Sequence, residues 1–363
     1  MTKHTHKKLR ALGVVLPQFH PIPENDEWWG RGFTEWTNAA NAKPRFRGHY
    51  QPHIPADLGF YDLRLEEARI AQAELAKKYG IYGFCYYHYW FHGKQLLERP
   101  VNEIIASGKP DFPFCLCWAN ESWTRGWDGH DKNIIQAQEY SKNDHVNHIK
   151  HLLEIFKDKR YIKVNGRPLI IAYRVKSIPD VEKMVEIWNT EAKKAGFERG
   201  LYILSTTAHW FNENPASLGF DASWDFLPYI RSPKVNFYFR VIRKIRKTLD
   251  LKDEVYLYSN IVDVALQNYR YSKQWKEYPC VCPGWDNSPR RKNGAYILHG
   301  STPELYEKWL ANTCEKFEPY SEEENFIFLN AMNEWAEGNH LEPDLKCGLK
   351  YLEATKKVLE MYK

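Results

Sequence analysis

Two glutamates near the C-terminal end of the sequence, Glu334 and Glu337, stand three residues apart in the segment Asn-Glu-Trp-Ala-Glu-Gly. Cleavage of a glycosidic bond needs two carboxyl groups beside the bond, one protonated to help the leaving oxygen depart and one ionised. Residues three apart face opposite sides of a straight strand, but a turn lets both side chains enter one cleft. Trp335 and the neighbouring carboxylate could raise the pKa of one of the two glutamates through desolvation and like-charge repulsion. We therefore predict a catalytic pair, although such a spacing is also common in solvated loops and helix starts.

Aromatic and polar residues gather where several predicted strands end. Flat aromatic rings cover the apolar face of a pyranose, and carboxylates, amides and imidazoles match its hydroxyl groups. A single Trp of this set is equally typical of packing between a barrel and its helices. The set as a whole predicts a sugar-binding cleft formed by Gln18, His20, Trp29, Glu35, Trp36, Tyr87, His88, Trp90, Asn120, Glu121, Trp123, Trp127, Asp128, Asp225, Trp285, Asp286, Asn333, Trp335 and His340.

The elements that must position these residues alternate between strand and helix along the whole chain. Strands are expected at residues 12–16, 81–87, 112–118, 168–173, 201–206, 221–226, 278–283 and 326–331. Helices are expected at residues 66–79, from 100 onward, and at 144–156, 181–195, 262–269, 303–314 and 345–362. Only a short helical turn is expected between the fifth and sixth strands. The long connection at 18–64 has little periodicity.

This alternation predicts an α/β fold, a single (β/α)8 TIM barrel with long βα loops. Residues 11–363 are expected to form the catalytic barrel domain and residues 1–10 a basic N-terminal tail. A doubly wound sheet is the alternative, but the segment Pro-Gln-Phe-His-Pro after the first strand lacks the glycine-rich fingerprint of that fold. The barrel places its active groups after the C-terminal ends of the strands, where the aromatic and polar clusters occur, whereas the opposite loops are ordinary charged turns.

Composition narrows the function classes. The chain has 363 residues and 15% aromatic residues, which excludes a disordered protein. Its net charge of +5, from 51 basic and 46 acidic residues, is too balanced to indicate a nucleic-acid partner. No apolar run is long enough to span a membrane. The apolar stretch behind the basic N-terminus is too short for a signal peptide, so the protein is expected to be cytoplasmic, unless a signal has been removed.

No metal or other cofactor is expected. His20, His49, His53, His88 and His92 show no established metal-ligand spacing and are expected to contact hydroxyl groups or to be packed. The sequence contains no Asp-x-Asp, no P-loop and no glycine-rich phosphate turn, which argues against a transferase that uses a nucleotide-sugar donor. The basic stretch 231–252 could bind a diphosphate or an anionic glycan, or it could be a solvated helix face.

The sequence resembles the WbsX-like proteins, glycosyltransferases of O-antigen (lipopolysaccharide) and polysaccharide loci, over nearly its whole length. These proteins in turn resemble glycoside hydrolase family 99, the endo-α-mannosidases and endo-α-mannanases with a (β/α)8 barrel. That second link is carried mainly by the order of the barrel elements and the Asn-Glu-Trp-x-Glu-Gly segment. The resemblance to the WbsX-like group rests on residues 19–36, 48–64, 83–100, 114–129, 283–290 and 330–344.

The resemblance implies roles for the glutamate pair. Glu334 would deprotonate the sugar 2-hydroxyl, which attacks C1 to give a 1,2-anhydro sugar, and Glu337 would act as the acid and then the base. The mannosidases typically have His where this sequence has Ala336, so the carboxylate pair carries over but mannose specificity does not. We expect a retaining glycoside hydrolase that acts on a bacterial polysaccharide or oligosaccharide. The alternatives are a glycosyltransferase of polysaccharide biosynthesis and a non-catalytic glycan-binding protein.

Overall fold

A computed structural model describes residues 7–125, 130–208, 211–228, 253–268 and 274–362. Its main sheet is parallel along the order β12-β10-β9-β8-β4-β2-β1-β16-β13. The strands of this sheet are β1 (Arg10–Val15), β2 (Gly83–Phe91), β4 (Phe114–Trp118), β8 (Arg167–Ala172), β9 (Tyr202–Thr207), β10 (Ala222–Asp225), β12 (Glu277–Tyr278), β13 (Cys280–Val281) and β16 (Phe326–Leu329).

The two edges of this sheet meet at a single segment of the chain. β12 pairs with β10, β13 pairs with β16, and only Pro279 separates β12 from β13. Proline has no backbone N–H and therefore interrupts a strand ladder. The sheet is thus a nearly closed barrel whose seventh strand is broken in two. This closure confirms the predicted (β/α)8 barrel and excludes the doubly wound alternative.

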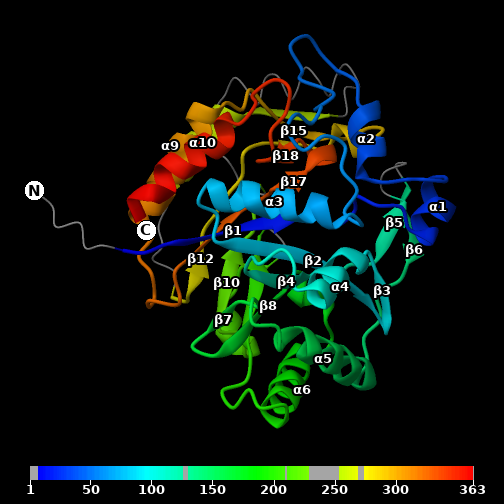
Figure 1. The fold of residues 1–363 in the computed structure, drawn as a ribbon, viewed down its shortest axis with the longest axis vertical. Helices are drawn as coiled ribbons and strands as arrows, with labels where there is room; N and C mark the ends of the chain where they lie inside the picture. The colour runs from blue at the N-terminus through cyan, green and yellow to red at the C-terminus, as the bar shows by residue number, and fades with distance from the viewer. Residues whose placement is uncertain (1–6, 126–129, 209–210, 229–252, 269–273, 363) are drawn as a thin grey trace, which may run out of the picture.

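The barrel strands are mostly apolar because both of their faces are covered. All nine residues of β2 and all five of β4 are buried. In Figure 1 the helices surround the sheet, with α5 beside α6 and α9 beside α10. The covering helices are α3 (Glu66–Lys78), α4 (Arg99–Ser107), α5 (Lys142–Phe156), α6 (Val181–Lys194), α8 (Tyr258–Asn268), α9 (Pro303–Lys316) and α10 (Lys350–Leu359). Among the described residues between β9 and β10, the one helical element is the short turn η3 (Pro215–Leu218), in agreement with the predicted helical turn.

Several predicted boundaries differ from the structure, among them the end of β2 and the start of α10, and two short helices were not predicted. β2 runs on to Phe91 instead of ending at residue 87, because it continues beyond the barrel and pairs with β3 (Lys94–Leu96). The connection at 18–64 contains two helices, α1 (Pro23–Trp29) and α2 (Glu35–Asn41), each too short to show a clear period. α10 begins five residues later than the expected start at 345.

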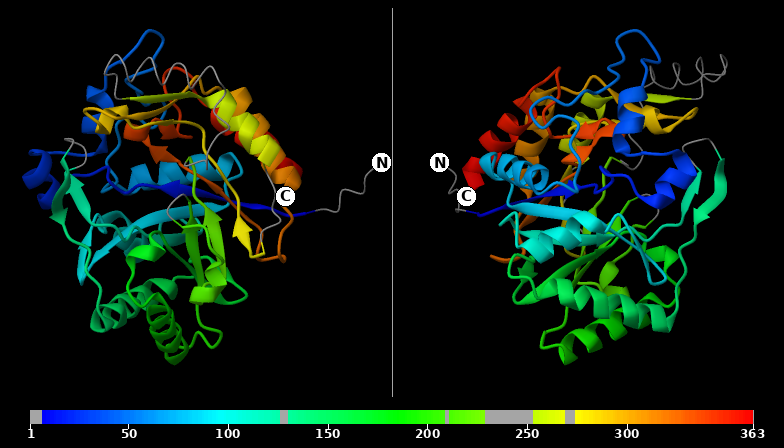
Figure 2. Two further views of the ribbon diagram at one scale, coloured as in Figure 1. Left: turned by 180° about the vertical axis from the view of Figure 1, so that it is seen from behind. Right: turned by 45° about the vertical axis from the view of Figure 1, so that its right-hand side comes forward.

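Several small elements lie beyond the C-terminal ends of the strands. Figures 1 and 2 show α1, α2, β5 and β6 at the end of the molecule opposite the C-terminus. The small elements of the βα loops are the hairpin of β5 (Trp123–Arg125) and β6 (His130–Gln136), the sheet of β11 (Glu254–Leu257), β15 (Tyr296–His299) and β14 (Trp285–Asp286), and the hairpin of β17 (Asn333–Glu334) and β18 (Asn339–His340).

No helix in the described part of the chain combines the length and the apolar character needed to cross a membrane. The predicted site residues Trp127 and Asp128, and the basic stretch 231–252, lie outside the described residues.

Candidate functional site

A cavity of about 400 Å³ opens among the βα loops. We call it the glutamate cavity, because Glu334 and Glu337 are both part of its wall. The predicted site residues that line it are Gln18, Trp29, Tyr87, Glu121, Trp123, Trp285, Glu334 and Glu337. Lining residues that were not predicted include Tyr89, Tyr173, Arg174, Phe226, Arg290 and Arg291.

Arg290 joins the two predicted catalytic glutamates to a third. Its Nη1 lies 2.7 Å from Glu337 Oε1, and its Nη2 lies 3.2 Å from Glu334 Oε2 and 2.6 Å from Glu35 Oε1. The Glu35 side chain is fully buried, and those of Glu334 and Glu337 are 7% and 16% exposed. One guanidinium, on a side chain that is 12% exposed, therefore faces three carboxylates, a group that we call the carboxylate cluster.

The bend after β17 brings the two catalytic candidates to the same guanidinium. Glu334 ends β17, and the 3-10 turn η5 (Trp335–Glu337) follows directly. Glu35, the first residue of α2, holds this turn from outside, because its Oε1 accepts a hydrogen bond from the backbone N–H of Ala336 at 3.0 Å. The predicted residue Glu35 thus lies in the carboxylate cluster without lining the cavity.

Burial and the charges of neighbouring carboxylates raise the pKa values of the pair. Burial is the largest cause of the rise of the Glu334 pKa from 4.5 to about 8, with the charges of Glu337 and Glu35 adding to it and Arg290 opposing it. The pKa of Glu337 is also raised, first by burial, with Arg290 opposing and the charge of Glu35 adding. Because one cation faces three acidic groups, we expect the pair to hold a shared proton near neutral pH.

A buried carboxylate below the pair fixes Trp335. Glu342 Oε2 accepts hydrogen bonds from Trp335 Nε1 and Tyr61 Oη, each at 2.8 Å, while its Oε1 accepts one from Gln72 Nε2 at 2.6 Å. The predicted residue Trp36 packs behind the same ring, with centroids 5.3 Å apart. Trp335 and Trp36 therefore support the loop rather than line the glutamate cavity.

Asn333 and Asn120 are also placed to support the cavity. Asn333 Nδ2 donates to the carbonyl of Leu16 at 3.0 Å, and its Oδ1 accepts from the Leu16 N–H at 2.8 Å, so the start of β17 is tied to the residue that follows β1. Asn120 holds the backbone of Arg174 through bonds of 2.9 and 2.7 Å. Arg174 in turn forms an ion pair with Glu121 at 2.7 Å at the cavity wall.

The structure places other predicted residues away from the cavity. His88 and Trp90 alternate with the cavity residues Tyr87 and Tyr89 along β2, so they face the opposite side of the strand. His88 Nε2 lies 2.9 Å from His148 Nε2 of α5, and Trp90 Nε1 donates to Asp144 Oδ1 at 2.8 Å. Both side chains therefore pack against α5.

Four more predicted residues do not line the glutamate cavity. His20 is 1% exposed, and burial lowers its pKa to about 4. Asp225 ends β10 outside the cavity wall. Asp286 and His340 line a separate pocket of about 100 Å³, described below.

Arg290 and Tyr89 are the functional candidates that the sequence did not predict. Arg290 is the last residue of the segment 283–290, one of those that carry the resemblance to the WbsX-like proteins. The resemblance therefore drew attention to this segment but did not assign a role to Arg290. Tyr89 follows Tyr87 by two residues, and a strand extended to Phe91 would have placed both on one face.

A comparison with protein families gives a match over most of the chain. The family described as "Glycosyltransferase WbsX" matches residues 11–355. A protein from Xanthomonas campestris pv. campestris (strain B100), named "Uncharacterized protein WxcX", is 39% identical over 350 residues, which cover 96% of this chain and 49% of that protein. The chain therefore spans about half the length of the curated relatives that it matches.

Two solved structures are similar in fold. An endo-α-mannosidase of glycoside hydrolase family 99 from Bacteroides thetaiotaomicron has 14% identity and a TM-score of 0.57, over 97% of each chain. A "Glycoside hydrolase-like protein" has 13% identity and the same TM-score, over 98% of this chain and 94% of that one. At these identities the likeness shows the barrel fold alone. The family match shows more: the chain belongs to the family described as "Glycosyltransferase WbsX".

Proposed function

We propose that the protein is a retaining glycoside hydrolase that acts on a bacterial polysaccharide or oligosaccharide through Glu334 and Glu337. One observation carries the proposal: both carboxylates contact Arg290 at the wall of a cavity lined by aromatic side chains. Two carboxyl groups at one cavity, with a proton to share, are what glycosidic cleavage requires.

The cavity suits a sugar in size and lining. A volume of about 400 Å³ lies within the range of small-ligand pockets. Trp29, Trp123 and Trp285 offer flat faces for the C–H side of a pyranose. Gln18 lines the cavity, and its buried amide nitrogen has no hydrogen-bond partner among the described residues. A sugar hydroxyl would satisfy that donor.

The proposed reaction has two steps. In the first, Glu334 takes the proton of the sugar 2-hydroxyl, O2 bonds to C1, the bond from C1 to the leaving oxygen breaks, and Glu337 gives its proton to that oxygen. In the second, Glu337 takes a proton from water, the water oxygen bonds to C1, the C1–O2 bond breaks, and O2 regains its proton from Glu334. Two inversions at C1 give overall retention, and both glutamates return to their starting states.

The shared proton must be on Glu337 when the first step begins. In the free protein, burial favours the protonated form of Glu334, with a pKa of about 8. A sugar 2-hydroxyl that donates a hydrogen bond to Glu334 would stabilise its ionised form, because hydrogen bonding to a carboxylate lowers its pKa. Substrate binding would then move the proton to Glu337, where the leaving oxygen needs it.

Sugar transfer is the second candidate, because it is the activity in the family's name. Arg174 and Arg291 line the cavity and offer positive charge to the diphosphate of a nucleotide-sugar. Arg174, however, is paired with Glu121, and Arg290 faces three carboxylates. Carboxylates of the wall thus already face these arginines, and Arg291 lies near Glu337, which favours hydrolysis over binding of a diphosphate.

Product analysis separates the candidates. The protein is incubated with fragments of capsular polysaccharide or lipopolysaccharide from its host, and separately with nucleotide-sugars plus an acceptor glycan. We expect new reducing ends in the first mixture. Turnover in the second mixture alone would make the protein a transferase. Glycan binding without turnover in either mixture would make it a binding protein.

A further inference from the structure

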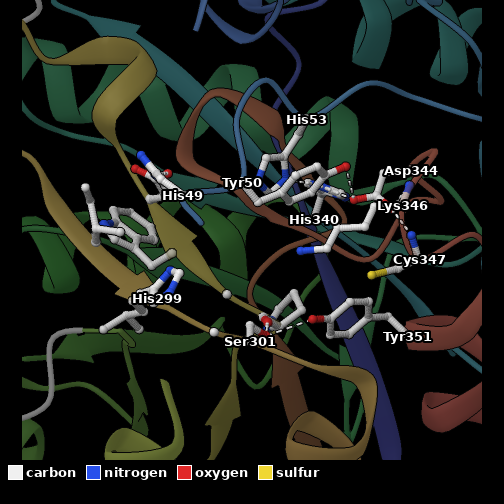
Figure 3. A pocket seen from close by; sticks show the side chains of 18 of the residues that line it. His49, Tyr50, His53, His299, Ser301, His340, Asp344, Lys346, Cys347 and Tyr351 are labelled. Carbon is white, nitrogen blue, oxygen red and sulfur yellow. Dashed lines mark hydrogen bonds and ion pairs between the residues drawn. The ribbon is translucent and has the colours of Figure 1, made fainter. Parts of the chain in front are cut away.

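A second pocket lies beside the glutamate cavity and shares Trp285 with it. It has a volume of about 100 Å³, enough for an ion and a few water molecules. In Figure 3, His53, His340 and Asp344 lie close together in this pocket, with Tyr50 beside them, while His49 and His299 lie further away. We call the first three residues the His-His-Asp cluster.

The three side chains of the cluster turn their ligand atoms toward one another. His53 Nδ1 lies 2.8 Å from His340 Nε2, and His340 Nε2 lies 4.0 Å from Asp344 Oδ2. All three atoms fall within 4.8 Å of one another. Tetrahedral Zn²⁺ with bonds of about 2.0–2.2 Å holds its ligand atoms roughly 3.3–3.5 Å apart. The observed separations bracket that value, so small side-chain rotations would bring all three atoms onto one ion.

The His340 ring is held in the tautomer that leaves Nε2 free to bind a metal. Its Nδ1 lies 2.9 Å from the carbonyl oxygen of Glu342, and a carbonyl only accepts, so Nδ1 carries the hydrogen. The lone pair of Nε2 therefore points to His53. The ring also stacks on Trp335 with centroids 3.8 Å apart and planes at 11°. A backbone carbonyl that fixes the tautomer of a ligating histidine is the usual outer contact of metal sites.

The Asp344 carboxylate is fixed in the same way. Its Oδ1 accepts the backbone N–H of Cys347 at 2.6 Å and that of Lys346 at 3.1 Å. Its Oδ2, the oxygen nearest His340, accepts from Tyr50 Oη at 3.0 Å. The side chain of Asp344 is 5% exposed, and that of His340 is 6% exposed. The cluster is thus largely pre-organised, and its one open side faces the small pocket.

We propose that His53, His340 and Asp344 bind a divalent transition metal, for which Zn²⁺ is the best match. Two imidazoles and one carboxylate suit Zn²⁺, and three protein ligands leave a fourth position for water in the pocket. The ion would join the segment around His53 to the segment 333–344, which begins at β17 and carries Glu334 and Glu337. The proposal is independent of the proposed function, because the cluster stands apart from the glutamate cavity.

The sequence predicted that His53 contacts hydroxyl groups or is packed and that His340 binds sugar, with no metal in the protein. His340 and Asp344 are four residues apart, but His53 lies 287 residues from His340 in the sequence. No local spacing could have joined them.

Zinc binding to the purified 363-residue chain tests the proposal. After treatment with a chelator and its removal, Zn²⁺ is titrated by calorimetry, and bound zinc is counted by elemental analysis after gel filtration. We expect one Zn²⁺ per chain and a rise in Tm when zinc is added. His340→Ala and Asp344→Asn should abolish the site, and Tyr50→Phe should weaken binding roughly 10-fold through loss of an outer contact. His299→Ala is the matched control, since His299 lines the same pocket outside the cluster, and it should bind zinc normally.

Cobalt gives a readout in the unsubstituted protein, in case a variant does not fold. Co²⁺ bound by the cluster should show visible absorption bands that Zn²⁺ removes by competition. A spectrum equal to that of hydrated Co²⁺, with no zinc retained after gel filtration, overturns the proposal. Zinc binding that survives both His340→Ala and Asp344→Asn also overturns it, because the ion would then bind elsewhere.

Discussion

Glu35 Oε1 accepts a hydrogen bond from the backbone N–H of Ala336 at 3.0 Å, across 301 residues of sequence. The same oxygen accepts a hydrogen bond from Arg290 Nη2 at 2.6 Å. Ala336 lies between Glu334 and Glu337, so Glu35 fixes the turn that carries the pair. Its charge also raises the pKa values of both glutamates. Position and protonation of the pair thus depend on one side chain that does not line the cavity.

Glu35→Gln should therefore shift the pH dependence of activity. The amide keeps an oxygen for the Ala336 N–H but removes a negative charge, so the pKa values of Glu334 and Glu337 should fall. The alkaline limb of kcat/KM, which reports loss of the shared proton in the free enzyme, should then move to lower pH. The measurement is the pH profile of kcat/KM, with Glu182→Gln on the exposed side of α6 as the control. An unchanged alkaline limb would remove Glu35 from this role.

Arg290→Met should destabilise the protein strongly. Removing one partner of a buried ion pair leaves an uncompensated charge, which costs about 3–5 kcal/mol, and here three carboxylates lose their common cation. Unfolding in urea measures the effect, and Arg31→Met at an exposed position is the control. A loss below ~1 kcal/mol, the value of a surface pair, would show that the carboxylate cluster is not held by this guanidinium.

Stability should fall as pH rises between about 4.5 and 8, because of Glu334. Its pKa is 4.5 ordinarily and about 8 in the fold. The folded state therefore keeps a proton that the unfolded state releases, so the stabilisation present below pH 4.5 is lost as pH rises to 8. Glu334→Gln imitates the protonated form at every pH. The variant should therefore lack the fall in stability with rising pH that Glu334 causes. Thermal melts at pH 5 and pH 8.5 should show the Tm of the variant rising relative to the parent by about 2 °C or more at the higher pH. A constant difference would contradict the raised pKa.

Trp123 and Trp36 should respond differently to truncation. Trp123 lines the cavity, and its replacement by Ala should raise KM roughly 5- to 30-fold with little change in kcat, as expected for uniform binding worth 1–2 kcal/mol. Trp36 packs between Phe19 and Trp335, so its replacement should cost about 3–5 kcal/mol of stability. Steady-state kinetics and urea unfolding on both variants check this. Equal KM effects would place Trp36 at the cavity.

The sequence predicted the barrel because its strands are short apolar runs separated by amphipathic helices. Buried parallel strands require such runs, so Phe114–Trp118 and Phe326–Leu329 could be recognised without any contact information. The pair at Glu334 and Glu337 was recognisable because a polar, Trp-containing segment follows the last strand. These features are local, and local features can be read from one sequence.

Side-chain direction and long-range pairing could not be predicted. With β2 taken to end at residue 87, the alternation that turns His88 and Trp90 toward α5 was hidden. Arg290 owes its role to Glu35, Glu334 and Glu337, which come from two distant loops. Arg290 can hold several carboxylates only when the fold brings them to it. The spacing of residues in the sequence does not show which carboxylates these are.

The roles of the two glutamates are tested most directly by substrates with different leaving groups. The kcat/KM values of Glu337→Gln and Glu334→Gln are measured on the native glycan and on the glycosyl fluoride of the sugar that it releases, whose leaving group needs little protonation. Glu337→Gln should lose about 10²–10⁴-fold on the glycan but far less on the fluoride, while Glu334→Gln should lose activity on both. Full activity of Glu337→Gln on the native glycan would contradict the catalytic pair.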